Sequence, residues 1–295
     1  MAALRRRILL GMVSAALVSL AGCSSINTLN AVNSLTPGDR GTNRVASNIA
    51  FGSDPRQRLD IYAPAAAGSG KAPVVIFFYG GSWNSGRRQD YVFAARALAA
   101  QGFIVVVPDY RLVPQVKFPA FVQDGAAAVA WTVANIARHG GDPARIGVSG
   151  HSAGAYIALM LALDGRWLQA AGASGAVKAA VGLAGPYDFL PFVPGAAADK
   201  ALGGQPDPAA TQPISFASSA APPVLLLNGS DDTTVLPRNA TQLAAMLKSK
   251  GASAEARLYP DIGHIGIVLA ISKPFRGKAP VLTDTTAFFK RTLGG

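Results

Sequence analysis

The feature that most constrains this chain is a glycine-flanked serine between a predicted strand and a predicted helix. The pentapeptide Gly-His-Ser-Ala-Gly at 150–154 follows the apolar run 145–148 and precedes the helical pattern 156–161. A strand that turns sharply into a helix at a Gly-x-Ser-x-Gly pentapeptide holds the serine hydroxyl above the edge of a sheet. The free N–H groups at the start of that helix favour a developing negative charge. The pattern therefore predicts that Ser152 is a nucleophile.

A serine nucleophile needs a base, and the sequence contains three histidines, His139, His151 and His264. His139 lies in a polar turn that leads into the strand before the serine, so we expect it at the opposite end of that strand. His151 adjoins the serine and its side chain should diverge from the hydroxyl, which favours a structural role or a place in the pocket wall. His264 lies on a glycine-flanked loop after the strand-like run 254–259. Elimination therefore predicts that His264 is the base.

The base should be oriented by a carboxylate. The apolar run 222–227 predicts a buried strand, and Asp231 and Asp232 follow shortly after it. A carboxylate at the end of a buried strand must be solvated or paired, and we favour Asp232. The alternative for both is a cap of the predicted helix that starts at Pro237. Asp188, which also follows an apolar run, is a further candidate.

A second glycine-containing turn follows another predicted strand. The apolar run 73–78 leads into Tyr-Gly-Gly-Ser-Trp at 79–83. Glycines allow the backbone to approach a ligand closely with its N–H groups pointing inward. With the N–H of Ala153, these amides would form an oxyanion hole, in which one donor contributes about 3–4 kcal/mol. A simple tight turn is the alternative interpretation of Gly-Gly after a strand.

These segments together resemble the α/β-hydrolase superfamily. Within it they are similar to the carboxylesterase and lipase branch, which includes hormone-sensitive-lipase-like and kynurenine-formamidase-like enzymes. The order Ser152, Asp232, His264 is the order of the triad in that fold. The motifs that carry the resemblance are Tyr-Gly-Gly-Ser-Trp at 79–83, Asp-Tyr-Arg-Leu at 109–112, Gly-His-Ser-Ala-Gly at 150–154, and residues 229–235 followed by Gly-His at 263–264.

The resemblance implies site residues beyond the triad. The oxyanion amides would be those of Gly81, Ser82 and Ala153. Trp83 and His151 would contribute to substrate binding. The family usually has histidine at the position of Tyr79, so the way in which this chain sets the geometry of the oxyanion turn is open.

The rest of the chain fits one α/β domain, expected at 49–295. Strand and helix patterns alternate, as a mostly parallel sheet covered by helices requires. The segment 191–213 is rich in Pro, Gly and Ala and interrupts this alternation after the sixth predicted strand. In this fold such an insertion supplies a small cap or pocket lid, and a surface loop is the alternative. The alternating patterns include 103–107, 121–137, 179–183 and 239–250.

The first residues predict export and a lipid anchor. Arginines at 5–7 precede the apolar run 8–20, which is shorter than the about 20 residues of a membrane-spanning helix. This pattern is typical of a secretory signal. Leu-Ala-Gly-Cys-Ser at 20–24 resembles the bacterial lipobox, with Cys23, the only cysteine of the chain, at the modified position. We expect a signal peptide at 1–22; an ordinary cleaved signal is the alternative.

Cys23 would therefore begin a flexible tether, expected at 23–48 because this stretch is polar and lacks sustained periodicity. The lipid bilayer would be a partner through this cysteine. A lipid anchor predicts a location in the bacterial cell envelope. Because the residue after Cys23 is Ser24 and not aspartate, we expect the outer membrane in a Gram-negative host.

The net charge of +11 has two interpretations. Scattered Lys and Arg of a basic composition is the one we favour, and attraction to anionic lipid or polysaccharide surfaces is the other. Basic runs with interleaved aromatics, which would indicate nucleic-acid binding, are absent from the sequence. Metal-ligand clusters and phosphate loops are absent as well, so we expect no metal and no cofactor.

The sequence thus predicts a serine carboxylesterase that hydrolyses small or medium acyl esters through an acyl-enzyme, with a small-molecule ester as its substrate. An arylformamidase-like amide hydrolase is the alternative, because the same motifs serve both reactions. A non-catalytic envelope binding protein is a third hypothesis. The sequence leaves the oligomeric state open.

Overall fold

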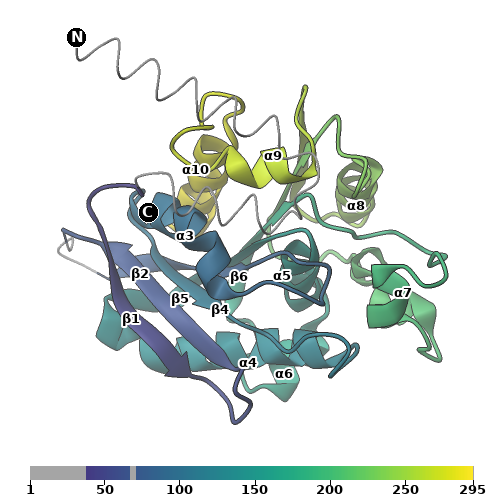
Figure 1. Ribbon diagram of the computed structural model, residues 1–295, viewed down its shortest axis with the longest axis horizontal. Helices are drawn as coiled ribbons and strands as arrows, with labels where there is room; N and C mark the ends of the chain where they lie inside the picture. Colours follow the sequence, from purple (N-terminus) through teal and green to yellow (C-terminus); the bar gives the residue numbers. More distant parts are fainter. Residues whose placement is uncertain (1–37, 67–70, 295) are drawn as a thin grey trace.

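One twisted sheet organises the computed structural model, which describes residues 38–66 and 71–294 (Figure 1). Its eight strands lie in the order β1-β2-β4-β3-β5-β6-β7-β8. β1 and β2 run antiparallel to their neighbours, and the strands from β4 to β8 are parallel. The bounds are β1 (Thr42–Ala50), β2 (Arg58–Pro64), β3 (Ala72–Phe78), β4 (Ile104–Pro108), β5 (Gly141–His151), β6 (Val177–Leu183), β7 (Val224–Gly229) and β8 (Ala254–Tyr259).

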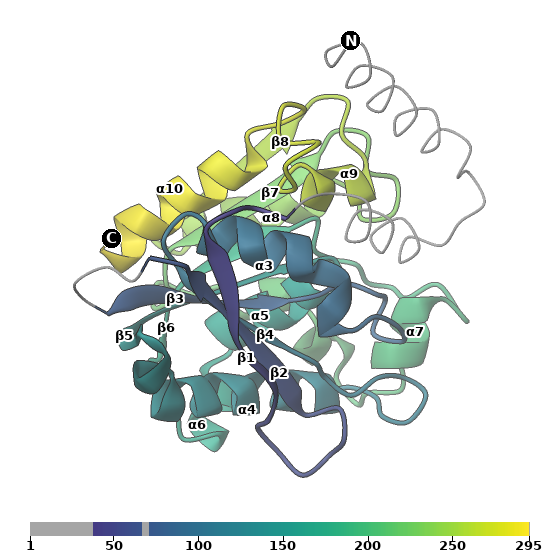
Figure 2. The same cartoon turned by 60° about the vertical axis from the view of Figure 1, so that its left-hand side comes forward.

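Helices cover both faces of this sheet. Figures 1 and 2 show α3 and α10 on one face and α4 with α6 on the other. α5 packs on β5 and β6 next to α4, and α8 packs on β7 and β8. Within the described ranges, no helix combines the length and apolar character needed to cross a membrane. The bounds are α3 (Val92–Ala99), α4 (Ala120–Asn135), α5 (Ala153–Leu163), α6 (Gly165–Ala170), α7 (Ala197–Leu202), α8 (Arg238–Ser249), α9 (His264–Leu269) and α10 (Val281–Leu293).

The central strands are apolar along their whole length because both of their faces are covered. Every residue of β4 and β7 is buried, and so are all residues of β3 after the first. The predicted strands at 73–78, 103–107, 179–183, 222–227 and 254–259 are observed within a few residues of their expected bounds. The predicted helical patterns at 121–137 and 239–250 are α4, with a 3-10 turn after it, and α8. The expected mostly parallel α/β sheet is confirmed.

The start of the domain differs from the expectation. The tether was expected to reach residue 48, but β1 (Thr42–Ala50) already pairs with β2 from Thr42 onward. The side chains of β1 are largely exposed, so its sequence shows no alternation of apolar and polar residues. Two register shifts also interrupt its pairing with β2. Backbone pairing holds it instead. The predicted signal peptide at 1–22, Cys23 and the part of the predicted tether up to residue 37 lie outside the described residues.

The insertion between β6 and β7 is a small folded segment rather than an extended loop. It contains α7 and the 3-10 turns Pro208–Thr211 and Pro213–Phe216. The hydroxyl of Tyr156 on α5 donates to the carbonyl of Thr211 at 2.8 Å, and the amide of Phe118 donates to the carbonyl of Ala201 at 2.9 Å. These bonds hold the insertion beside the start of α4 and against α5.

Candidate active site

Ser152 lies in a strained turn between the end of β5 and the start of α5. Its backbone has φ 54° and ψ −122°, a conformation that L-residues seldom adopt. A Cβ on Gly150 would lie 2.4 Å from the backbone of Gly154, and a Cβ on Gly154 would lie 2.2 Å from the carbonyl oxygen of Phe78. Only glycine therefore fits at both flanking positions, as the pentapeptide predicts.

The turn brings Ser152 within reach of two other predicted site residues. Nε2 of His264 lies 2.9 Å from the Ser152 hydroxyl oxygen, and its Nδ1 lies 2.8 Å from a carboxylate oxygen of Asp232. These three side chains follow β5, β8 and β7, whose carboxyl ends meet at one edge of the parallel sheet. A hydroxyl, an imidazole and a carboxylate connected in this order can perform nucleophilic catalysis.

The carboxylate of Asp232 is fixed on both of its oxygens. It is 2% exposed, and its Oδ1 accepts hydrogen bonds from the amides of Thr234 at 2.9 Å and Val235 at 2.8 Å. Burial raises the pKa of the Asp232 carboxyl, but the hydrogen bond and charge of His264, together with the two amides, lower this pKa below its ordinary value. Asp232 is therefore held as an anion that faces Nδ1 of His264.

The other carboxylates considered from the sequence lie elsewhere. Asp231 is exposed, and its carboxylate accepts a hydrogen bond from the hydroxyl of Ser230 at 2.7 Å. Asp188 is half-buried, and its amide donates to the side chain of Asn239. Of these three aspartates, Asp232 is the one that contacts the imidazole of His264.

His151 is not a pocket-wall residue, which corrects its predicted place in substrate binding. It is 1% exposed, and both ring nitrogens are occupied by protein groups. Nδ1 lies 2.8 Å from the hydroxyl of Tyr91, and Nε2 lies 2.9 Å from the carbonyl oxygen of His264. Burial and the neighbouring His264 lower the pKa of His151 to about 3, so this ring is neutral. His139 lies before β5, at the far end of that strand, as expected.

The predicted oxyanion turn has an unusual backbone. Gly81, Ser82 and Trp83 all have positive φ, at 144°, 52° and 59°, and the amides of Asn84 and Ser85 close the turn onto the carbonyl of Gly81 at 3.0 Å. Within residues 38–66 and 71–294, the amides of Gly81 and Ser82 donate to no protein acceptor.

The amide of Ala153 is the first of α5, where a helix leaves N–H groups without intrahelical partners. This amide and those of Gly81 and Ser82 have no protein acceptor among the described residues, so they are available as the donors of the predicted oxyanion hole.

Tyr79 anchors this turn in place of the histidine that is usual in the resembling family. It is fully buried, its ring stacks on Tyr110 with centroids 4.5 Å apart, and its carbonyl accepts a hydrogen bond from the Tyr110 hydroxyl at 2.9 Å. Arg56 donates to the Tyr79 hydroxyl at 2.7 Å and to the carbonyl of Gly86 at 2.9 Å. Arg56 therefore ties the start of the turn to its end, a role that no local sequence pattern predicts.

Trp83 lies in an aromatic cluster beside α5. It is 4% exposed and packs edge-on against Tyr156 at 5.4 Å and face-on against Phe189 at 6.5 Å, with Phe121 at 6.2 Å. Phe189 follows β6 and belongs to the connection that carries the insertion. The sequence predicted Trp83 at the site, but it gave no signal for Phe189 because tertiary packing alone brings that ring over Trp83.

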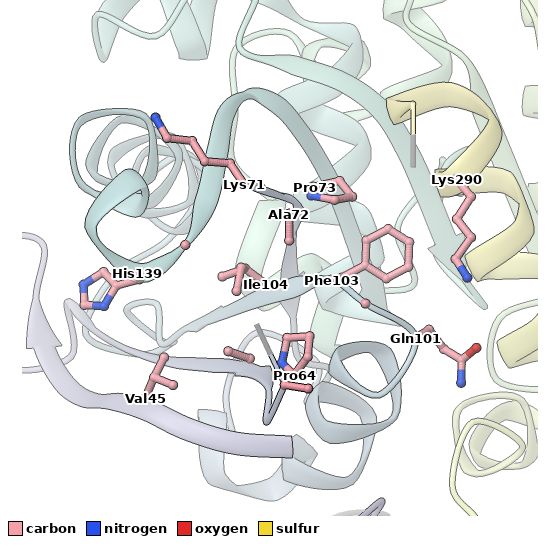
Figure 3. Close-up of a pocket in the computed structure, with 14 residues that line it drawn as sticks. Val45, Pro64, Lys71, Ala72, Pro73, Gln101, Phe103, Ile104, His139 and Lys290 are labelled. Carbon is pink, nitrogen blue, oxygen red and sulfur yellow. The ribbon is translucent and has the colours of Figure 1, made fainter. Parts of the chain in front are cut away.

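A cavity of about 750 Å³ opens at the opposite edge of the sheet, away from Ser152. Its lining includes the first residues of β3 and β4 and His139 (Figure 3). Figure 3 shows Lys71 and Lys290 on opposite sides of it with their ammonium groups directed away from each other. In the described part of the chain, no cluster of three or more His, Cys, Asp or Glu side chains is placed to hold a metal ion.

Known proteins are similar to this chain in sequence and in fold. The BD-FAE family model matches residues 59–247. Isoprenylcysteine alpha-carbonyl methylesterase from Arabidopsis thaliana is 31% identical, over 82% of this chain and 61% of its own length. Esterase LipC from Mycobacterium tuberculosis is also 31% identical, over 73% of this chain and 58% of its own length. The chain thus spans about three-fifths of the length of these relatives.

Solved structures show the same architecture. Esterase B from Lactobacillus rhamnosis, inhibited by a tributyrin phosphonate, superposes with a TM-score of 0.79 at 21% identity, covering 98% of this chain and 96% of that one. A carbohydrate esterase from gut microbiota superposes with a TM-score of 0.75 at 22% identity, over 88% of this chain and 99% of that one. Likeness at this identity shows the fold, and this fold is the α/β-hydrolase.

Proposed function

This chain belongs to the BD-FAE family, in the carboxylesterase and lipase branch of the α/β-hydrolases, and we propose that it is a serine carboxylesterase acting on small or medium acyl esters. The observation that carries the proposal is the hydrogen-bonded chain from Ser152 through His264 to Asp232. Relatives and structural neighbours that are named esterases support an ester as the substrate class.

The geometry assigns each side chain one step. The Ser152 oxygen attacks the ester carbonyl carbon while Nε2 of His264, at 2.9 Å, takes the hydroxyl proton. The tetrahedral intermediate then expels the alcohol, which receives that proton, and leaves an acyl group on Ser152. Water attacks the acyl-enzyme with the same imidazole as base, which releases the carboxylic acid and restores the hydroxyl. Throughout, Asp232 holds Nδ1 protonated and stabilises the imidazolium.

We assign the amides of Gly81, Ser82 and Ala153 as the donors to the charge that forms on the carbonyl oxygen. They are fixed before substrate arrives, because the turn at Gly81 is closed by backbone hydrogen bonds and Ala153 begins a buried helix. Donors that need no reorganisation stabilise an oxyanion more strongly than water does, and the loss of one such donor lowers kcat by about 10²- to 10³-fold.

The test compares two serines of the same strand and turn. Ser152→Ala should abolish hydrolysis of p-nitrophenyl esters, because loss of a triad member lowers kcat by about 10⁶-fold. Ser149→Ala is the matched control: Ser149 is fully buried, its hydroxyl has no hydrogen-bond partner in the described structure, and its loss should leave kcat unchanged. More than a few per cent of activity in pure Ser152→Ala protein would overturn the proposal.

The substrate panel separates the alternatives to an esterase. p-Nitrophenyl acetate, butyrate and octanoate report ester hydrolysis and acyl length, and N-formylated aryl amines report arylformamidase activity. Faster turnover of the formamides would assign the alternative amide hydrolase. If the protein hydrolyses neither the esters nor the formamides and also fails to react with a fluorophosphonate, a binding protein is favoured.

We further propose that the protein is lipid-anchored through Cys23 in a bacterial cell envelope, and in the outer membrane of a Gram-negative host. The support is the lipobox-like sequence at 20–24 with the chain's single cysteine at its modified position. A diacylglyceryl cysteine carries two acyl chains, and two chains give stable anchoring where one does not. Mass spectrometry of the mature N-terminus tests this, and an unmodified N-terminus at another residue would contradict it.

A further inference from the structure

One buried histidine beside the turn at Ser152 is not used by the proposed chemistry. His151 precedes the nucleophile and lies 113 positions before His264, yet its Nε2 is 2.9 Å from the carbonyl oxygen of His264. The two imidazole rings lie side by side with centroids 4.9 Å apart. His151 therefore contacts the backbone of the proposed base while its ring is excluded from solvent.

The partners of His151 determine which of its nitrogens carries the proton. A backbone carbonyl only accepts hydrogen bonds, so Nε2 of His151 must be the donor toward His264. A neutral imidazole has one N–H, so Nδ1 is the acceptor and the hydroxyl of Tyr91, at 2.8 Å, donates to it. The hydrogen bond at one ring nitrogen thus selects the tautomer presented by the other.

The same network lies directly under the oxyanion turn. A Cβ on Gly80 would lie 2.9 Å from Nδ1 of His151 and 2.9 Å from the hydroxyl of Tyr91. The backbone just before Gly81 therefore packs against this pair without space for a side chain. His151 thus contacts the backbone of His264, and the pair of His151 and Tyr91 lies against Gly80 at the start of the oxyanion turn.

We propose that His151 is a positioning residue that fixes the backbone of His264, and that Tyr91 sets the tautomer in which His151 does so. Gly263 precedes α9 and offers no side chain to cap this helix. The hydrogen bond from His151 to the carbonyl of His264 restrains the backbone of the residue whose imidazole must reach both Ser152 and Asp232. This inference rests on the proposed function of that triad.

The electrostatics of the pair fit this role. His264 becomes positively charged during each half-reaction, and a second charge 4.9 Å away would oppose it. Burial and the nearby His264 hold the pKa of His151 far below its ordinary value, so His151 stays neutral while its neighbour gains a proton.

The experiment compares steady-state kinetics of His151→Phe, His151→Gln and Tyr91→Phe on p-nitrophenyl acetate. Phenylalanine keeps the ring but has no donor, so kcat should fall by about 100-fold, as for a reacting group displaced by about 1 Å, with KM within twofold of wild type. The Nε2 of glutamine can replace the missing donor, so His151→Gln should recover most of kcat. Tyr91→Phe should lower kcat by roughly 5- to 10-fold, as expected for the loss of one neutral supporting hydrogen bond.

A double variant separates positioning from a general structural defect. Since Tyr91 acts through His151, the variant with both residues replaced by phenylalanine should be no slower than His151→Phe alone. His139→Phe, at the other end of β5, is the matched control and should keep wild-type kinetics. Circular dichroism and thermal melting establish that each variant is folded.

The outcomes are distinguishable. An inactive wild-type protein would overturn the proposed function itself. With an active wild type, a folded His151→Phe variant that keeps its kcat, or that changes only KM, would overturn the positioning role. Should His151→Phe fail to fold, an unchanged kcat in Tyr91→Phe would overturn it.

Discussion

Replacing Asp232 with asparagine should misdirect the triad without dismantling it. Oδ1 of Asp232 accepts the amides of Thr234 and Val235 at 2.9 and 2.8 Å. Asparagine has a single acceptor oxygen, which must remain at these two amides. Its NH₂ group then occupies the place of Oδ2, 2.8 Å from Nδ1 of His264. A donor at that place requires an unprotonated Nδ1, so the proton moves to Nε2 and the imidazole can no longer accept the proton of Ser152.

The magnitude follows from the contacts that the competent tautomer would have to break. With a proton on Nδ1, two buried donors would face each other, and each unpaired buried donor costs about 1–3 kcal/mol. The variant also lacks the charge-assisted bond that stabilises the imidazolium, worth about 1.5–3 kcal/mol. At about 1.36 kcal/mol per factor of ten, these losses correspond to a fall in kcat of roughly 10³- to 10⁷-fold, with 10⁴-fold typical of such a substitution in other triads.

The assay is kcat on p-nitrophenyl acetate at neutral pH, with thermal melting to confirm that Asp232→Asn is folded. Asp231→Asn is the matched control, because Asp231 is exposed and its carboxylate contacts Ser230 rather than His264; its kcat should stay within twofold of wild type. A folded Asp232→Asn variant within tenfold of wild type would refute the argument. So would a larger effect at Asp231.

Three further predictions concern folding, pH and processing. Gly154→Ala should abolish soluble, active protein because its Cβ would lie 2.2 Å from the backbone oxygen of Phe78, whereas Gly165→Ala, where a Cβ meets nothing within 4 Å, should match or slightly exceed wild-type stability; thermal melts compare them. Folding lowers the pKa of His151 from 6.5 to about 3, so between these pH values the unfolded chain binds a proton that the folded one does not. The unfolding free energy should therefore decrease as pH is lowered through that window, and urea titrations at pH 7 and pH 4 should show a smaller decrease for His151→Phe. Cys23→Ser should leave an unprocessed precursor without lipid, seen by mass spectrometry of membrane fractions; a processed N-terminus in this variant would contradict the lipoprotein assignment.

Much of this arrangement could be predicted because local physics dictates it. β3 and β7 are buried on both faces, so their sequences are uninterrupted apolar runs that end where the loops begin. The turn at Ser152 leaves no space for a Cβ at its flanking glycines, so the motif is visible in the sequence. His264 could be reached by elimination because the chain has so few histidines.

The remainder depends on contacts between distant segments. β1 is largely exposed, and backbone pairing rather than side-chain periodicity defines it. The burial of His151 follows from its contacts with Tyr91 and with a carbonyl 113 positions later, and the sequence beside Ser152 contains no sign of either. Arg56 likewise reaches Tyr79, 23 positions later in the chain. Such pairs become visible only when the fold is known.

The insertion between β6 and β7 has a consequence for how this protein can diversify. Its contacts with the rest of the domain include backbone carbonyls, as where Tyr156 donates to Thr211 and Phe118 to Ala201, and a carbonyl is present whatever side chain the residue bears. Substitutions at the exposed positions of 191–213 can therefore accumulate while these attachments persist, whereas the buried side chains of Ala201, Leu202 and Thr211 are constrained by packing. The exposed part of this segment can thus vary without moving the reacting groups at the sheet edge.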